Sequence, residues 1–218
     1  MGRVIPSVMA RSQKELDALL LRLSGVSGSL HVDVVDGKFA PSKSLWFDFR
    51  LPSKVFSYSA HVMVTNPLRW TTQYGSRFDM MFVQVEAVSD VQRYIDLCRG
   101  RGWKVCFALK PETSLMILKK YISSIDAVLV LCVTPGFYGS PFVPLALRKI
   151  SVLKRWKPPV TVYVDGHMNS ETIGCASLAG GDYFIVGSAL TLASSPVQAK
   201  RELEKIVLGN KKKVLGDR

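Results

Sequence analysis

Short apolar segments alternate with amphipathic segments along almost the whole chain. The apolar segments are rich in Val, Ile, Leu and aromatic residues, a composition that is typical of strands buried on both faces. They predict eight strands, over residues 4–8, 29–34, 58–63, 80–85, 104–109, 127–133, 161–165 and 183–186.

Between the predicted strands, apolar residues recur every three or four positions, which is the period of an amphipathic helix. The pattern predicts helices over residues 16–23, 91–98, 115–121, 145–153, 173–178 and 197–208. The stretch after Asp36, which contains Trp46 and Phe47, is the least regular. There we expect a loop with a short helix.

Eight strands that alternate with helices indicate a parallel sheet, and eight such units close naturally into a (β/α)8 TIM barrel. An open doubly wound sheet is the alternative, but it favours a glycine-rich fingerprint after the first strand, and residues 7–10 contain no glycine. No linker or shift in composition divides the chain. We therefore expect one barrel domain over residues 1–209, followed by a frayed basic tail over residues 210–218.

The chain has 218 residues, 48% of them hydrophobic, which is enough for one sizeable core. Its net charge of +12 is compatible with nucleic-acid binding. However, the basic residues are scattered, only Lys211 to Lys213 form a run, and no nucleic-acid motif accompanies them. We therefore expect a solvated basic surface that binds no nucleic acid and that attracts anionic substrates.

The four cysteines, Cys98, Cys106, Cys132 and Cys175, lack the spacing of a metal site. Cys106 and Cys132 lie in apolar runs and are expected to be buried thiols, which favours a reducing compartment. The first residues lack the apolar core of a signal peptide, and the longest apolar run, 127–133, is too short to span a bilayer. The expectation is a soluble cytoplasmic protein with no membrane association.

A histidine and a carboxylate stand two residues apart in His31 and Asp33, so in a strand they share one face, about 6–7 Å apart along the chain. His61, Asp165 and His167 also lie at or just after the ends of predicted strands. A single histidine at such a place is usually structural. Two imidazoles with carboxylates suit zinc or ferrous iron, although the spacing alone does not establish a metal site.

Glycines follow the last three predicted strands, at Gly136 and Gly139, at Gly166, and at Gly187 before Ser188. Loops of this kind, with a short helix N-terminus, form the usual phosphate site of a barrel. Each glycine alone is weak evidence, because turns commonly contain glycine. A metal on one side and a phosphate on the other indicate a phosphorylated sugar whose enediolate the metal stabilises, with a carboxylate on each face to move a proton.

Over residues 4–208 the chain resembles the ribulose-phosphate 3-epimerase family. The matching motifs are Pro6-Ser7, His31-Val32-Asp33-Val34-Val35-Asp36-Gly37, His61-Val62-Met63, Pro135-Gly136-Phe137, Val164-Asp165-Gly166 and Val186-Gly187-Ser188-Ala189. The resemblance implies the metal ligands His31, Asp33, His61 and Asp165, and the acid/base pair Asp33 and Asp165. It also implies substrate contacts from Ser7, His61, Gly136, Phe137, Tyr138, Gly139, Gly166, His167, Gly187 and Ser188.

In the mechanism that this resemblance implies, the metal binds the ketone and C3 hydroxyl oxygens of the sugar. One aspartate removes the C3 proton and leaves a 2,3-enediolate, and the other delivers a proton to the opposite face. This converts D-ribulose 5-phosphate and D-xylulose 5-phosphate into each other. The resemblance further implies a divalent cation, Zn2+ or Fe2+ with Mn2+ or Co2+ as alternatives, and a homo-oligomer.

Four positions depart from the usual pattern of the family. Val35 stands where methionine is frequent, Gln84 where histidine is usual, and Tyr138 and His167 where glycines are common. The segments 62–65 and 110–113 are at least as similar to the related allulose-6-phosphate 3-epimerases, so a six-carbon substrate is an alternative. A non-catalytic sugar-phosphate-binding relative is another, and the four intact metal and acid/base positions argue against it.

Overall fold

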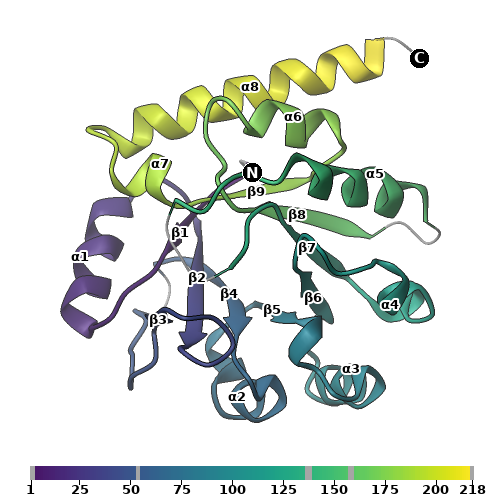
Figure 1. Cartoon of the computed structure of the whole chain (residues 1–218). Coiled ribbons are helices and arrows are strands. Elements are labelled where there is room, and N and C mark those ends of the chain that lie inside the picture. Colours follow the sequence, from purple (N-terminus) through teal and green to yellow (C-terminus); the bar gives the residue numbers. More distant parts are fainter. Residues whose placement is uncertain (1–2, 53–54, 136–138, 157–159, 217–218) are drawn as a thin grey trace.

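A computed structural model of the chain describes residues 3–52, 55–135, 139–156 and 160–216, with side chains up to residue 210. Eight parallel strands follow one another around a barrel, and β1 pairs with both β2 and β9, which closes it (Figure 1). The predicted TIM barrel is therefore confirmed, and an open sheet is not formed. The eight strands are β1 (Val4–Val8), β2 (Ser29–Asp36), β4 (Ser57–Met63), β5 (Met80–Gln84), β6 (Cys106–Leu109), β7 (Ala127–Leu131), β8 (Thr161–Asp165) and β9 (Tyr183–Val186).

Helices surround the barrel on its outside (Figure 1). They are α1 (Gln13–Leu23), α2 (Pro67–Tyr74), α3 (Val91–Gly100), α4 (Met116–Lys119), α5 (Leu147–Arg155), α6 (Ile173–Leu178), α7 (Ser188–Thr191) and α8 (Pro196–Gly216). Short 3-10 turns occupy Gly75–Arg77, Val85–Ala87, Ile122–Ser124 and Pro144–Ala146. No helix in the described part of the chain is both long and apolar enough to cross a membrane.

Four segments differ from the predictions, one of them the short helix α7, which no predicted helix range includes. The stretch after Asp36 forms no short helix; instead β3 (Lys43–Ser44) turns back antiparallel to β2, because the end of β2 offers it unpaired backbone groups. Helix α2 was missed, although Asn66 caps it and Pro67 occupies its first turn. Helix α8 continues to Gly216, so residues 210–216, expected as a frayed tail, extend the helix, since lysines are good helix formers.

Alternate residues of each strand point into the barrel or outward to the helices. Inside the barrel, away from the carboxyl ends of the strands, the inward residues form an apolar cluster of Ile5, Phe82, Cys106, Ala108, Ala127, Leu129, Leu131, Tyr163 and Ile185. The larger cluster lies between the strands and the helices, and there Cys98 and Cys132 are buried, as Cys106 is inside the barrel. Polar residues at inward positions near the strand ends must therefore face one another above an apolar floor.

The last helix is attached to the first strand. The backbone N–H of Val4 donates a hydrogen bond to the Glu204 carboxylate at 2.8 Å. The guanidinium of Arg22 on α1 also donates to the carbonyls of Thr191 and Ala193, just before α8. The beginning and the end of the chain are thus joined by direct hydrogen bonds as well as by the pairing of β1 with β9.

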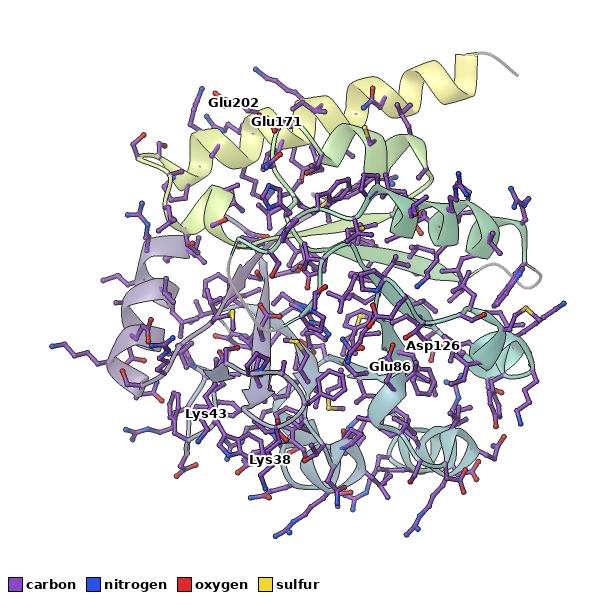
Figure 2. The ribbon with its side chains drawn as sticks, in the orientation of Figure 1. Lys38, Lys43, Glu86, Asp126, Glu171 and Glu202 are labelled. Atoms are coloured by element: carbon purple, nitrogen blue, oxygen red, sulfur yellow. The ribbon has the colours of Figure 1, made fainter. Side chains whose placement is uncertain are left out.

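Loops at the carboxyl end of the barrel contact one another through charged side chains. Figure 2 shows Lys38 on the loop after β2 and Glu86 after β5. The Glu86 carboxylate accepts hydrogen bonds from the Lys110 N–H at 2.9 Å and from the Thr113 hydroxyl. The Lys110 ammonium in turn lies 4.4 Å from the centre of the Phe39 ring. The loops after β2, β5 and β6 are therefore coupled.

Asp36 organises the loop that follows β2. Its carboxylate accepts hydrogen bonds from the N–H groups of Lys38 and Phe39, and from the N–H and hydroxyl of Thr65, all at 2.8 Å. Burial alone raises the pKa of a carboxyl, but here these hydrogen bonds outweigh it and hold the pKa of Asp36 below its usual value. The ends of β2 and β4 are thereby linked.

We predict that Asp36→Ala lowers the free energy of unfolding by roughly 3 kcal/mol, because four donors lose a charged acceptor in a buried setting. Urea unfolding at pH 7 measures this change. The matched control is Asp48→Ala, whose side chain is 93% exposed and 3.9 Å from Arg77, with an expected change within about 0.5 kcal/mol. Equal effects of the two substitutions would contradict the role of Asp36.

Candidate active site

Four ionisable side chains converge inside the barrel near the carboxyl ends of its strands. His31 and Asp33 come from β2, His61 from β4 and Asp165 from β8. Each offers one ligand atom, and these atoms all lie within 4.8 Å of one another. Inward strand positions account for the convergence, because Asp33 is the direct neighbour of His61 in the pairing of β2 with β4.

His61 lies between the two carboxylates. Its Nδ1 is 3.5 Å from Asp33 Oδ1 and 3.5 Å from Asp165 Oδ2. Burial disfavours the charged imidazolium, but the two carboxylates outweigh it and raise the pKa of His61 to about 9. His31 is completely buried, and its Nε2 lies 3.9 Å from Asp33 Oδ1; burial is the larger effect there and lowers its pKa.

Three ligand atoms of this cluster are buried without a hydrogen-bond partner among the described residues. They are His31 Nε2, Asp33 Oδ1 and His61 Nδ1. Buried polar atoms are normally hydrogen-bonded, so three unpartnered atoms at one place indicate a missing partner. Two imidazole nitrogens with carboxylate oxygens are a donor set for a divalent transition metal ion. The cluster could therefore hold such an ion.

A cleft of about 140 Å3 opens above the cluster. Asp33, His61 and Asp165 lie at its base, while His31 does not line it and lies beneath. The cleft brings together these further predicted site residues: Ser7, Gly139, Gly166, His167, Gly187 and Ser188. Gly136, Phe137 and Tyr138 lie outside the described residues. The cleft thus brings three members of the His/Asp cluster together with the glycine loops after β7, β8 and β9.

The turn after β8 is conformationally demanding. Gly166 has φ +99°, and a Cβ there would lie 2.7 Å from a methyl carbon of Val133. His167 has φ +55°, a backbone conformation that residues other than glycine rarely adopt. The Thr172 hydroxyl donates a hydrogen bond to the His167 carbonyl at 2.5 Å and so supports this conformation. His167 is consequently exposed at the rim of the cleft.

Two of the unusual positions have defined surroundings. Val35 packs with Ala40 and Met63 in a small apolar cluster near the end of β2. Gln84 is fully buried at the end of β5, and its amide nitrogen lies 2.8 Å from His61 Nε2. Ser59, which the sequence reasoning missed, lies 2.8 Å from His31 Nδ1. The signal was present, because Ser59 precedes His61 by two residues and therefore shares its inward face.

Comparison with known proteins gives a consistent result. The pattern described as the ribulose-phosphate 3 epimerase family matches residues 3–191. A ribulose-phosphate 3-epimerase of Schizosaccharomyces pombe is 29% identical over 216 residues, which cover 95% of this chain and 94% of the relative. One of Bacillus subtilis is 28% identical over 213 residues, covering 93% and 98%.

Solved structures resemble the fold at much lower identity. The crystal structure of KGPDC from Streptococcus mutans matches with a TM-score of 0.68 and 12% identity, covering 96% of this chain and 98% of that one. 3-Hexulose-6-phosphate synthase from Salmonella typhimurium matches with a TM-score of 0.64 and 14% identity, covering 96% and 100%. These similarities concern the barrel fold alone.

The raised pKa of His61 predicts how the stability of the metal-free protein depends on pH. The pKa is about 9 in the folded protein against 6.5 for a free imidazole, so the charged ring stabilises the fold fully below pH 6.5. This stabilisation is lost as the pH rises through 9. We expect the free energy of unfolding to fall by roughly 3 kcal/mol between these values, measured by urea unfolding with a chelator present.

His61→Asn is the variant that isolates this effect, and it should show a much flatter profile below pH 9. The buried cysteines have raised pKa values and add their own loss at higher pH, but both proteins share it. His167→Asn, at an exposed position, should keep the original profile. The assignment to His61 is wrong if His61→Asn retains the full dependence.

Proposed function

The chain belongs to the ribulose-phosphate 3-epimerase family and is an isomerase, and we propose that it inverts C3 of D-ribulose 5-phosphate to give D-xylulose 5-phosphate. The observation that carries this proposal is the placement of Asp33 and Asp165. Their carboxylates both lie 3.5 Å from one nitrogen of His61, at the base of a cleft rimmed by glycine loops. A 3-epimerase requires two such groups, because the proton leaves from one face and returns to the other.

The proposal includes a divalent cation held by His31, Asp33, His61 and Asp165. The three unpartnered buried atoms described above support it, since a cation would satisfy all of them. When bound, the cation supplies positive charge near the sugar oxygens on which negative charge develops. Zn2+ or Fe2+ suits two nitrogen and two oxygen donors best, with Mn2+ or Co2+ as alternatives.

The two aspartates exchange roles with the direction of the reaction. One carboxylate accepts the C3 proton of the ketose and leaves a 2,3-enediolate of the sugar. The other, already protonated, donates its proton to the opposite face of C3, so the proton count of the pair is unchanged. Asp33 is 8% exposed and the side chain of Asp165 is 16% exposed, so both carboxylates are largely shielded from bulk water, which limits competing exchange.

The loops of the cleft are proposed to bind the phosphate and the sugar chain. Gly139, Gly166, Gly187 and Ser188 present backbone close to the cleft, and backbone N–H groups with small side chains let an anion approach closely. Ser7, on the inner face of β1, lies beside them and offers a hydroxyl to the sugar. Gly136, Phe137 and Tyr138 complete the proposed set.

A second candidate is the D-allulose-6-phosphate 3-epimerase reaction of the same family. The observation that favours it is His167, whose side chain is held at the exposed rim by a left-handed backbone. An imidazole there adds a hydrogen-bonding group on the phosphate side of the cleft, where a six-carbon sugar differs in length from a five-carbon one.

We predict that Asp33→Asn and Asp165→Asn each lower kcat by about 10^3-fold or more, because an amide neither accepts nor returns the proton. Coupled assays of xylulose 5-phosphate formation measure this loss, and thermal unfolding checks the fold. Asp48→Asn, on the exposed surface, is the control and should retain full activity. Near-normal turnover in either site variant would exclude the two-aspartate mechanism.

We predict that turnover depends on a divalent metal ion. Metal-stripped and metal-restored protein should be assayed on ribulose 5-phosphate and allulose 6-phosphate, and the ratio of kcat/KM values identifies the substrate. Absence of turnover on both sugars with any divalent ion contradicts the proposed function.

We predict that His167→Gly shifts this ratio of kcat/KM values several-fold, because His167 contacts the sugar phosphate in the second candidate function. An unchanged ratio assigns His167 no part in substrate selection.

A further inference from the structure

The two histidines of the cluster face its centre through different ring nitrogens. His31 directs Nε2 toward Asp33, and His61 directs Nδ1 toward both carboxylates. Both nitrogens are buried without a hydrogen-bond partner in the described part of the chain. A neutral imidazole offers a lone pair at one nitrogen only, so each ring needs a particular tautomer to present that nitrogen to a cation.

Ser59 contacts the outer nitrogen of His31. It is the direct neighbour of His31 in the pairing of β2 with β4, and its hydroxyl oxygen lies 2.8 Å from His31 Nδ1. A hydroxyl can accept the hydrogen bond that a protonated Nδ1 donates. In that arrangement the proton stays on Nδ1, and the lone pair of Nε2 is directed into the cluster.

Gln84 contacts the outer nitrogen of His61. Its side chain is fully buried, and its amide nitrogen is placed 2.8 Å from His61 Nε2; a half-turn of the amide would bring Oε1 to this position instead. If the amide nitrogen faces His61, it donates to Nε2, the ring proton must sit on Nδ1, and Gln84 Oε1 is buried without a partner among the described residues. If the oxygen faces His61 instead, it accepts from Nε2–H and leaves the Nδ1 lone pair free.

We infer that Ser59 and Gln84 are positioning residues that select the histidine tautomers of the cluster, with the Gln84 oxygen turned toward His61. They leave His31 Nε2 and His61 Nδ1 as the two nitrogen ligands. The inference rests on the proposed metal site and deepens it, because it concerns residues that touch neither the cation nor the sugar. Outer partners of this kind orient metal-bound imidazoles and fix their tautomers.

Both positioning groups are electrically neutral. A carboxylate in the place of Gln84 or Ser59 would add negative charge and increase the basicity of the imidazole. With a hydroxyl and an amide, these two partners add no formal charge to that of Asp33 and Asp165 in the described part of the site. Ser59 and Gln84 therefore set the direction of the lone pairs without changing the charge.

Nitrogen NMR of the intact protein tests the tautomers directly. The chain contains only His31, His61 and His167, so labelling histidine with 15N gives three ring systems, and the exposed His167 is the internal reference. After addition of Zn2+, we expect protonated Nδ1 with zinc-shifted Nε2 for His31, and protonated Nε2 with zinc-shifted Nδ1 for His61. The opposite tautomer at His61 overturns the role of Gln84, and the opposite tautomer at His31 overturns that of Ser59.

Zinc affinity, measured by competition with a chromophoric chelator, provides the second readout. We expect Gln84→Leu to weaken zinc binding by roughly 10–100-fold and to disturb the tautomer of His61 but not that of His31. Gln84→Glu, unlike Gln84→Leu, should keep the His61 tautomer with its proton on Nε2, because the carboxylate also accepts a hydrogen bond from Nε2–H. Ser59→Ala should weaken zinc binding and disturb the tautomer of His31 but not that of His61.

The controls are chosen from similar residues without contact to the cluster. Gln92→Leu, on the exposed side of α3, and Ser57→Ala, two residues before Ser59 on β4, should leave zinc affinity unchanged. Unchanged affinity in both Gln84→Leu and Ser59→Ala overturns the inference while the metal site stands. If Zn2+ shifts no histidine of the unmodified protein, the proposed metal site fails together with the inference, and the NMR result holds even if a variant does not fold.

Discussion

Two aspartates and two histidines share the interior of a barrel that is otherwise apolar, and the mutual compensation of their charges is the constraint on which the site depends. A buried carboxylate is costly unless a positive charge or hydrogen bonds accompany it. In the metal-free protein the protonated ring of His61 provides that charge to Asp33 and Asp165. The divalent cation proposed for this cluster would replace the single positive charge of the His61 proton by two, one for each carboxylate.

The barrel makes this arrangement possible by separating polar and apolar layers along its axis. Below the cluster, Phe82 and Tyr163 have ring centres 4.7 Å apart and fill the interior with aromatic carbon. Phe82 also contacts the ring of His31, at 6.0 Å between centres. In the described part of the chain, the two aspartates open to solvent through the cleft at the carboxyl ends of the strands, and the apolar floor strengthens the electrostatic interactions above it.

The sequence predicted the eight parallel strands well, because strands buried on both faces consist of short, nearly unbroken apolar runs. It also placed His31, Asp33, His61 and Asp165 at strand ends, and alternation along each strand then implied a common face. Ser59 and β3 were not predicted. The spacing to His61 places Ser59 on the inward face, but its contact with His31 depends on the pairing of β2 with β4, which local periodicity does not contain. Strand β3 likewise depends on the free edge of β2.

The hydrogen bond between Val4 and Glu204 joins residues that are 200 positions apart, and β1 completes its pairing only with β9. During synthesis on the ribosome, one edge of β1 therefore stays unpaired until nearly the entire chain, including β9, has been made. Until then the nascent polypeptide is an open sheet with exposed backbone donors, the state most vulnerable to intermolecular association. Contacts between residues so far apart in the sequence also slow the closure of the barrel. The candidate active site is therefore assembled late in folding.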